Sequence, residues 1–327
     1  MATDAVTKTR PAEGILSPSR LAWRSFLRNR TAVVGMVACA IFFVAAVFGL
    51  LLTKGERPAL DARQVRLADK FRPPFSLPNR EAVSADALPR LGIYLLGTDE
   101  LGRDVFARML EGAFVSLSVG FVAVGIAVAI GIALGGIAGH YGRRRIGIGP
   151  LRLMTVDTLI AGLIDVMLCF PSFFLILTVV AVLKPSIWNI MVVIGLTSWT
   201  GTARFVRAEI LSLREQDFVQ AAHALGVSGR QIILRHLIPN AMAPVLVSAT
   251  LGIAGAILTE SGLSFLGFGV PPPDASWGNI LSDGKNYLFD AAWLTTIPGT
   301  AIFIVVLAFY IFGEGLREAF NPKLRQL

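Results

Sequence analysis

The stretch GAFVSLSVGFVAVGIAVAIGIALGGIAG, residues 112–139, decides the fold class of this chain. It contains no charged residue, and its apolar side chains form a block rather than an amphipathic or alternating pattern. A helix needs about twenty apolar residues to cross a hydrocarbon layer of roughly 30 Å. The stretch therefore predicts a membrane-spanning helix. Its Gly131, Gly135 and Gly139, spaced four apart, predict that another helix approaches the backbone closely.

Further apolar blocks follow the same rule. The third block along the chain, residues 153–183, is longer than a simple span and is interrupted by Asp157, Asp165 and Pro171. A transmembrane barrel is the rival architecture, but barrel strands alternate apolar and polar residues over about ten positions, and these blocks do not. We therefore predict an all-α integral membrane bundle of six transmembrane helices. Its blocks are residues 32–52, 112–139, 153–183, 186–203, 241–262 and 291–313.

The overall composition agrees with this architecture. Of the 327 residues, 54% are hydrophobic and 16% are charged, so the apolar surface exceeds what a soluble core of this length would bury. The first block begins only at residue 32, after six basic side chains, and is too long for the apolar region of a signal peptide. We expect it to remain in the protein as an anchor.

The net charge of +8 is distributed as membrane topology requires. Lys and Arg number six before the first block, four in residues 140–152, five in 204–236 and three after residue 313. Short cationic loops stay cytoplasmic, so both termini are predicted inside. Anionic lipid headgroups attract the same side chains. The basic excess therefore indicates membrane lipid as a partner and no nucleic acid.

The predicted spans divide the chain into five parts. The segment after the first span contains five prolines, which break helices, and we expect it to be irregular. Its last part, residues 102–112, mixes charged and apolar side chains and predicts a short interfacial helix. The parts are a cytoplasmic segment 1–31, the first span 32–52, an external loop 53–111, a core of five helices at 112–313 with a cytoplasmic loop at 204–240, and a cytoplasmic tail 314–327.

Besides Asp157 near the start of the third block, Asp165 lies deeper in that block and Glu260 lies in the fifth. A charged group at membrane depth is costly and usually faces the bundle interior or water. Asp165 is either such a group or a carboxylate bonded to neighbouring backbone near a helix end. The role of Glu260 stays open in the same way.

Catalytic and metal sites are not indicated. The three histidines are scattered over two loops, and Cys39 and Cys169 lie inside apolar blocks, where a thiol behaves as a small buried hydrophobe. An intramembrane hydrolase would need a Ser-His pair or paired Asp residues inside the spans. No phosphate-binding loop of the form G-x-x-x-x-G-K-[ST] occurs, so ATP is not expected to bind to this chain.

The loop between the fourth and fifth spans contains REQDFVQAAHALGVSGRQIILRHLIPN, residues 214–240. Asp217 favours a helix start. The helix it opens has one narrow apolar face, made of Phe218, Ala221, Ala222 and Leu225 at i, i+3, i+4 and i+7. Such a face forms either a knob that docks in a partner's groove or an amphipathic hairpin that rests on headgroups.

A second helix is predicted to follow directly. Gly226 ends the first helix as a C-cap, and Ser228 with Gln231 forms a capping-box pattern. Pro239 is expected to stop the second helix. The loop is thus predicted to be two short helices at an angle.

These residues resemble a known family. DFVQAAHALGVSGRQIILRHLIPN is similar to the EAA loop of binding-protein-dependent ABC importers, although Gln220 replaces the usual Glu. The segments 97–117, 260–281 and 312–325 resemble the second permease subunit of the bacterial dipeptide/oligopeptide branch. The resemblance implies an ATPase-coupling role for Asp217, Phe218, Ala221, Ala222, Leu225, Gly226, His236, Pro239 and Asn240.

The resemblance also implies partners and a fold. We expect a type I ABC importer permease fold in the inner membrane, a second homologous permease, two ATPase subunits that bind ATP and Mg²⁺, and an extracytoplasmic substrate-binding protein. Relatives in this branch take up dipeptides, oligopeptides, glutathione, nickel complexes or opines, and peptides are favoured by default. A secondary transporter is the alternative, but the inverted repeats typical of that class are not seen in the sequence.

Two positions limit what the resemblance implies. Where the family often has Met-Arg, this chain has Ala161 and Gly162 before Asp165, so Asp165 needs another partner. Trp277 and Gly278 follow three prolines and are expected at the external face, where the indole is either an interfacial anchor or a contact for the binding protein.

Overall fold

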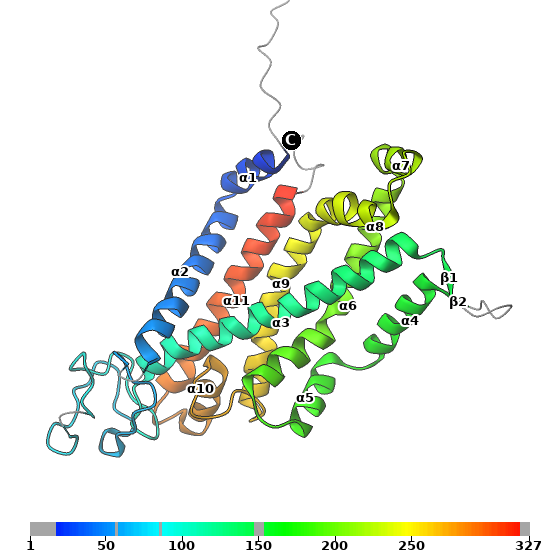
Figure 1. The fold of residues 1–327 in the computed structure, drawn as a ribbon. Helices are drawn as coiled ribbons and strands as arrows, with labels where there is room; N and C mark the ends of the chain where they lie inside the picture. The colour runs from blue at the N-terminus through cyan, green and yellow to red at the C-terminus, as the bar shows by residue number, and fades with distance from the viewer. Residues whose placement is uncertain (1–17, 56–57, 85–86, 147–153, 321–327) are drawn as a thin grey trace, which may run out of the picture.

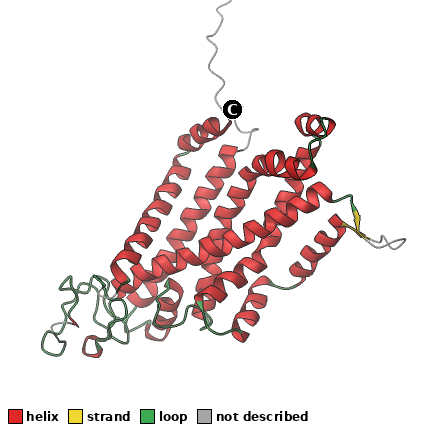
Figure 2. Cartoon of the chain, in the orientation of Figure 1, coloured by secondary structure: helices red, strands yellow, loops and turns green. Residues whose placement is uncertain are grey.

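The computed structural model describes residues 18–55, 58–84, 87–146 and 154–320. Parts of the predicted terminal segments, residues 1–17 and 321–327, lie outside the described residues. The described chain is mainly helical, as expected, and its long helices run together as one bundle (Figures 1 and 2). Helix α1, the end of α11 and helix α7 lie at one end of the bundle, and the segment after α2 lies at the other. These helices span Pro18–Arg28 (α1), Trp293–Phe320 (α11), Asp217–Ala224 (α7) and Arg30–Thr53 (α2).

The bundle is built around the pair α3 (Val105–Tyr141) and α6 (Ile187–Arg214). The glycine spacing on α3 predicted a close approach, and the structure confirms it. A Cβ added to Gly131 would lie 2.6 Å from Cβ of Thr202, and one added to Gly135 would lie 2.5 Å from the carbonyl oxygen of Ala203. The seam between the two helices therefore depends on residues without a side chain.

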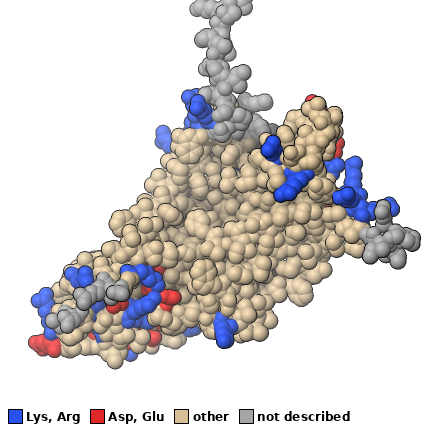
Figure 3. All heavy atoms as spheres, viewed as in Figure 1, with Lys and Arg blue, Asp and Glu red and all other residues tan. Residues whose placement is uncertain are grey.

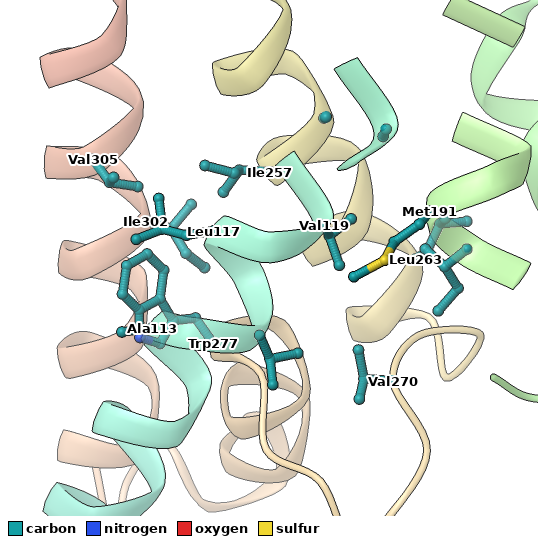
Figure 4. Packing of buried hydrophobic residues seen from close by; sticks show 14 of the residues in the cluster. Ala113, Leu117, Val119, Met191, Ile257, Leu263, Val270, Trp277, Ile302 and Val305 are labelled. Atoms are coloured by element: carbon teal, nitrogen blue, oxygen red, sulfur yellow. The ribbon is translucent and has the colours of Figure 1, made fainter. Parts of the chain in front are cut away.

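Helices α2 and α9 (Ile238–Phe265) pack on α3, and α11 packs on α2 and α9. A short helix, α10 (Trp277–Gly284), folds back against α3, α9 and α11. The largest apolar core forms where α3, α6, α9, α10 and α11 meet, and Figure 4 shows it around Trp277. The outward faces of the long helices carry exposed apolar side chains. On the face shown in Figure 3, charged residues gather toward the ends of the bundle and leave a middle band almost free of them, as a membrane protein requires.

The predicted third span is broken in two. Helix α4 (Val156–Cys169) follows a two-residue antiparallel hairpin, β1 (Arg145–Ile146) and β2 (Met154–Thr155), and α5 (Ser172–Val182) follows α4. The two helices are bent by 80° relative to each other. Pro171 explains the break, because a residue before proline is pushed out of the helical region and Phe170 has φ −98° and ψ 130°.

The remaining spans follow the predicted blocks with longer ends. Among the described residues, four helical stretches are long and apolar enough to cross a membrane, and the bent pair makes up to five. Helix α6 has the same length as α9, 28 residues, but it is more polar. The six predicted blocks therefore all correspond to helices, although the number of clear spans is smaller.

The external loop differs from the prediction at its end. The expected short helix at residues 102–112 is not separate, because α3 starts at Val105 and continues without a break. Asp104 caps α3, and its carboxylate accepts a hydrogen bond from the amide of Phe106 at 2.9 Å. The helix therefore begins before the apolar block does.

The loop before it is irregular, as expected, but it is folded. Among its described residues is a 3₁₀ turn, η1 (Leu67–Asp69). The buried Tyr94 donates its hydroxyl to Asp69 at 2.7 Å, and Asp69 also accepts the amide of Asn79 at 3.0 Å. Burial raises the pKa of Tyr94, and its bond to Asp69 adds to this. The segment is thus held by side-chain hydrogen bonds and by isolated backbone bridges, such as that between Ser76 and Tyr94, rather than by regular strands.

Candidate coupling site

Helix α7 projects beyond the end of the bundle, two residues after α6 ends (Figure 1). Asp217 lies in its first turn, as predicted. Val219 and Ala222 are buried and pack in a cluster with Leu213, Ile232 and Leu237. The helix is therefore seated on the rest of the chain along one edge.

The outward ridge of α7 consists of Phe218, Ala221 and Leu225, and we call these three residues the coupling ridge. Phe218 is 40% exposed and Leu225 83% exposed. The prediction placed Ala222 on the same outward face, which is wrong, because Ala222 turns toward Ile232 and is 7% exposed. Large apolar side chains this exposed at the tip of a molecule indicate an interaction surface.

Gly226 ends α7 as predicted. Its φ of +76° is a left-handed conformation, its amide donates to the carbonyl of His223 at 3.0 Å, and the amide of Val227 donates to the carbonyl of Ala222 at 3.1 Å. A Cβ at this position would meet nothing within 4 Å. The backbone conformation alone therefore requires glycine here.

Gly226→Ala is expected to destabilise the α7 turn by about 1 kcal/mol, because an L side chain is strained at positive φ. Hydrogen exchange of the α7 amides should become faster, while exchange in the spans should not change. Gly255→Ala is the matched control, since a Cβ there also meets nothing and the backbone is helical. Unchanged exchange in α7 would contradict the strain.

The second helix does not stop where the sequence predicted. Ser228 caps α8 (Gly229–Ile232), and its hydroxyl oxygen accepts the amide of Gln231 at 3.4 Å. The Gln231 side chain accepts the Ser228 hydroxyl at 3.0 Å instead of reaching the cap backbone, so the predicted capping box is only half formed.

A π-helical turn, Ile233–Leu237, then joins α8 to α9, and Pro239 lies inside the continuous helix. The turn shifts the hydrogen bonds by one residue, so that the amide of Ile238 donates to Ile233. Pro239 lies at the start of α9, directly after this π turn, where the altered hydrogen bonding accommodates its ring and its missing donor. The Asn240 amide nitrogen donates to the carbonyl of His236 at 2.6 Å, and the His236 ring lies 6.5 Å from Phe218. Residues 229–265 therefore form one continuous helical stretch, which begins directly after the turn at Gly226 and includes a membrane span.

Asp165 has a basic partner, in place of the arginine that the family often has and this chain lacks. Its carboxylate lies 3.3 Å from the guanidinium of Arg204 on α6, and both side chains are exposed. Asp157 pairs with Arg207 on the same helix at 2.7 Å. Both ion pairs join α4 to α6. The exposed Asp165–Arg204 pair contributes little to stability, whereas the Asp157–Arg207 pair is half-buried and bidentate.

Glu260 is fully buried and faces the bundle interior. It accepts the hydroxyl of Ser264 at 2.7 Å and that of Ser116 at 3.3 Å, and the backbone amide of Trp277 donates to Ser116 at 3.2 Å. One carboxylate thus links α9, α3 and α10. Buried acids need such partners, and hydroxyl groups supply them here.

Glu260→Gln is expected to destabilise the protein by about 1–2 kcal/mol, because an NH₂ group replaces one of the two oxygens that accept serine hydroxyls. Thermal unfolding of the purified protein in mild detergent measures the loss. Thr259→Val, at the exposed neighbouring position, should have no comparable effect. Equal midpoints for the two variants would show that the serine contacts do not stabilise the bundle.

Trp277 and Gly278 do not lie on the external surface. Trp277 is 2% exposed, its indole nitrogen donates to the carbonyl of Met109 at 3.1 Å, and its ring meets Phe42 edge to face at 5.7 Å (Figure 4). A Cβ on Gly278 would lie 2.7 Å from Cα of Ser261. The expectation of an interfacial anchor or a binding-protein contact is therefore wrong, because α10 folds back into the bundle.

Comparison with known proteins decides the family. Residues 131–326 match the family described as the inner membrane component of binding-protein-dependent transport systems, and residues 17–74 match the N-terminal transmembrane domain of oligopeptide transport permease C. The chain belongs to this permease family.

Curated relatives agree over nearly the full length. The chain is 37% identical over 95% of its length to the dipeptide transport system permease protein DppC of Alkalihalophilus pseudofirmus, of which 91% is covered. It is 34% identical to the Haemophilus influenzae protein of the same name, over 95% of this chain and 96% of that one. The Bacillus subtilis oligopeptide transport system permease protein OppC is 32% identical over 96% and 94% of the two chains.

Solved structures show the fold. A chain of an inward-facing structure of the MetNI methionine ABC transporter superposes on this protein with a TM-score of 0.50 and 16% sequence identity. The match includes 66% of this protein and 98% of the solved chain. This likeness supports the predicted type I ABC importer permease fold.

The permease also has a charged cluster at its other end that sequence reasoning missed. Arg108 binds Asp99 at 2.6 Å and Asp283 at 3.0 Å. The buried Glu111 lies 2.9 Å from Lys54 at the end of α2. The opposite charges before the second span were a visible signal, but two of their partners, Asp283 and Lys54, lie too far along the chain to be paired from the sequence. The segments 97–117 and 260–281, which resemble family motifs, lie against each other, since Ser116 bonds to Glu260 and Trp277 to Met109.

Proposed function

We propose that this permease is one of two homologous membrane subunits of an ATP-driven importer for peptides. Its family and its fold support membrane transport. The substrate class is supported by the relatives, which are named as dipeptide, di/tripeptide and oligopeptide permeases. Glutathione, nickel chelates or opines are the alternative substrates, since the permease sequence does not distinguish them.

The coupling ridge is the observation that carries the mechanism. Phe218, Ala221 and Leu225 form a small apolar surface at the tip of the bundle, and α8, the π turn and α9 join it to a span as one helix. We infer that this ridge inserts into a cleft of a partner ATPase. Closure of the ATPases would then move α9 as a rigid element, as alternating access requires.

The remaining parts of the importer lie outside this chain. Two ATPase subunits would bind ATP and Mg²⁺ and hydrolyse ATP, a second permease would complete the pathway, and an extracytoplasmic binding protein would deliver the peptide. The basic loops at residues 140–152 and 204–236 support a cytoplasmic position for the coupling ridge and both termini.

Purification of this permease from its native membrane in mild detergent tests the proposal. A second permease and P-loop ATPases should co-elute, and binding protein loaded with peptide should stimulate ATP hydrolysis by the complex. A lone chain that transports without ATPases would contradict the proposal. Stimulation by a nickel chelate or glutathione, but not by peptides, would overturn only the substrate class.

A further inference from the structure

Helix α1, PSRLAWRSFLR, is seated on the bundle by one narrow edge. Ala22 and Phe26 are 4% and 1% exposed. The Phe26 ring meets Phe312 of α11 edge to face at 5.7 Å, in a small cluster that includes Ala32 and Ala319. Helix α1 therefore contacts the last span as well as the first (Figure 1).

The opposite side of α1 is a basic stripe. Arg20, Arg24 and Arg28 recur every four residues, so they project on one side of the helix, and all three are exposed. Within the part of the chain that the structure describes, none of them forms an ion pair with a carboxylate. The nearby Glu318 accepts a hydrogen bond from Asn29 at 2.6 Å instead. Among the described residues, the three cations on α1 thus have no acidic partner.

Apolar side chains flank the basic stripe. Leu21, Trp23 and Leu27 are 42%, 52% and 46% exposed, and Trp23 stacks on Phe26 with ring centroids 5.7 Å apart. A helix with a strongly basic side and exposed Trp and Leu beside it is typical of the membrane interface. Tryptophan in particular favours the level of the headgroups.

The position of α1 places this surface next to lipid. Only Asn29 separates α1 from α2, and α2 exposes Val34, Val37 and Ile41 on its outward side. Acyl chains of the lipid are expected to cover this apolar face, which continues from α2 toward α1. Headgroups lie directly beyond acyl chains, at the level where α1 crosses the end of the bundle.

We propose that α1 binds anionic phospholipid headgroups. Arg20, Arg24 and Arg28 pair with the lipid phosphates, and Trp23 and Leu27 insert among the upper acyl carbons. Because Phe26 packs on Phe312, bound headgroups also support the end of α11. This inference does not depend on the substrate or on the identity of the ATPases.

Tryptophan quenching in the full-length permease tests the proposal. The protein is reconstituted into vesicles of phosphatidylcholine with either brominated phosphatidylcholine or brominated phosphatidylglycerol as a minor component. The signal of Trp23 is the difference between the native chain, which has five tryptophans, and Trp23→Phe. We expect much stronger quenching of Trp23 by the brominated phosphatidylglycerol. Each arginine lost should weaken the preference by roughly fivefold.

Two variants separate charge from fold. Arg20→Gln/Arg24→Gln/Arg28→Gln should abolish the preference for the anionic lipid, and Arg20→Lys/Arg24→Lys/Arg28→Lys should keep most of it. Equal quenching by both lipids in the native protein, or a preference that survives the glutamine variant, would overturn the proposal. A third outcome would also overturn it. If the glutamine variant lost its co-purified ATPase while the quenching of Trp23 stayed unchanged, the stripe would bind a protein rather than lipid.

Discussion

A permease carrying Leu225→Asp is expected to fold normally and to lose ATP-driven transport almost completely. Leu225 is 83% exposed at the tip of α7, so its replacement removes nothing from the core of the chain. If the coupling ridge inserts into the ATPase, burying this leucine contributes about 1.5–3 kcal/mol to association. An aspartate buried there without a partner adds a further penalty. The affinity for the ATPase should therefore fall by at least about 100-fold.

Two measurements on the same preparation check this prediction. The ATPase that co-elutes with the permease should decrease, while the thermal midpoint of the permease itself should not move. Leu225→Met keeps the apolar volume and should retain transport. Normal co-elution and transport in Leu225→Asp would remove α7 from the coupling surface.

Gly135→Ala is expected to separate α3 from α6 and to prevent accumulation of folded permease. The added Cβ would lie 2.5 Å from the carbonyl oxygen of Ala203, which belongs to the backbone of α6 and cannot move independently. Overpacking a seam of this kind costs about 3 kcal/mol or more. That is a large part of the stability of a typical protein.

The neighbouring glycine provides a matched control. A Cβ on Gly136 would have Cδ1 of Ile210 as its nearest neighbour, at 3.8 Å, which is ordinary contact. Gly136→Ala should therefore be neutral or slightly stabilising, since alanine favours the helix. Size-exclusion chromatography of the two variants in detergent measures the folded fraction. Equal yields of folded protein would contradict the close approach of α3 and α6.

The helices were predictable because the apolar blocks are long and uninterrupted. Blocks at residues 32–52 and 241–262 became α2 and α9 with only slightly longer ends. Pro171 was noticed in the third block, but local sequence does not specify an angle, and the 80° bend depends on what packs around it. The continuation of α9 through Pro239 was missed because a π turn has no sequence signal of its own.

The errors at the candidate site have a common cause, which is contact between distant residues. Trp277 was expected outside because it follows three prolines, but Met109, 168 residues away, accepts its indole hydrogen bond. From helical periodicity, Ala222 and Leu225 are neighbours three residues apart, and that part of the prediction holds. Periodicity could not show that the edge carrying Ala222 is covered by Ile232 of the same chain.

Photo-crosslinking from the coupling ridge tests the central claim most directly. Benzoylphenylalanine is placed at Leu225, at the end of α7, or at Val182, at the end of α5; these side chains are 83% and 84% exposed. Helices α7 and α5 lie at opposite ends of the bundle (Figure 1). Native membranes are irradiated with and without ATP. We predict that the probe at position 225 crosslinks to a P-loop ATPase, with a yield that depends on nucleotide, and that the probe at 182 does not. Crosslinks from position 225 to lipid alone, in both nucleotide conditions, would contradict the account.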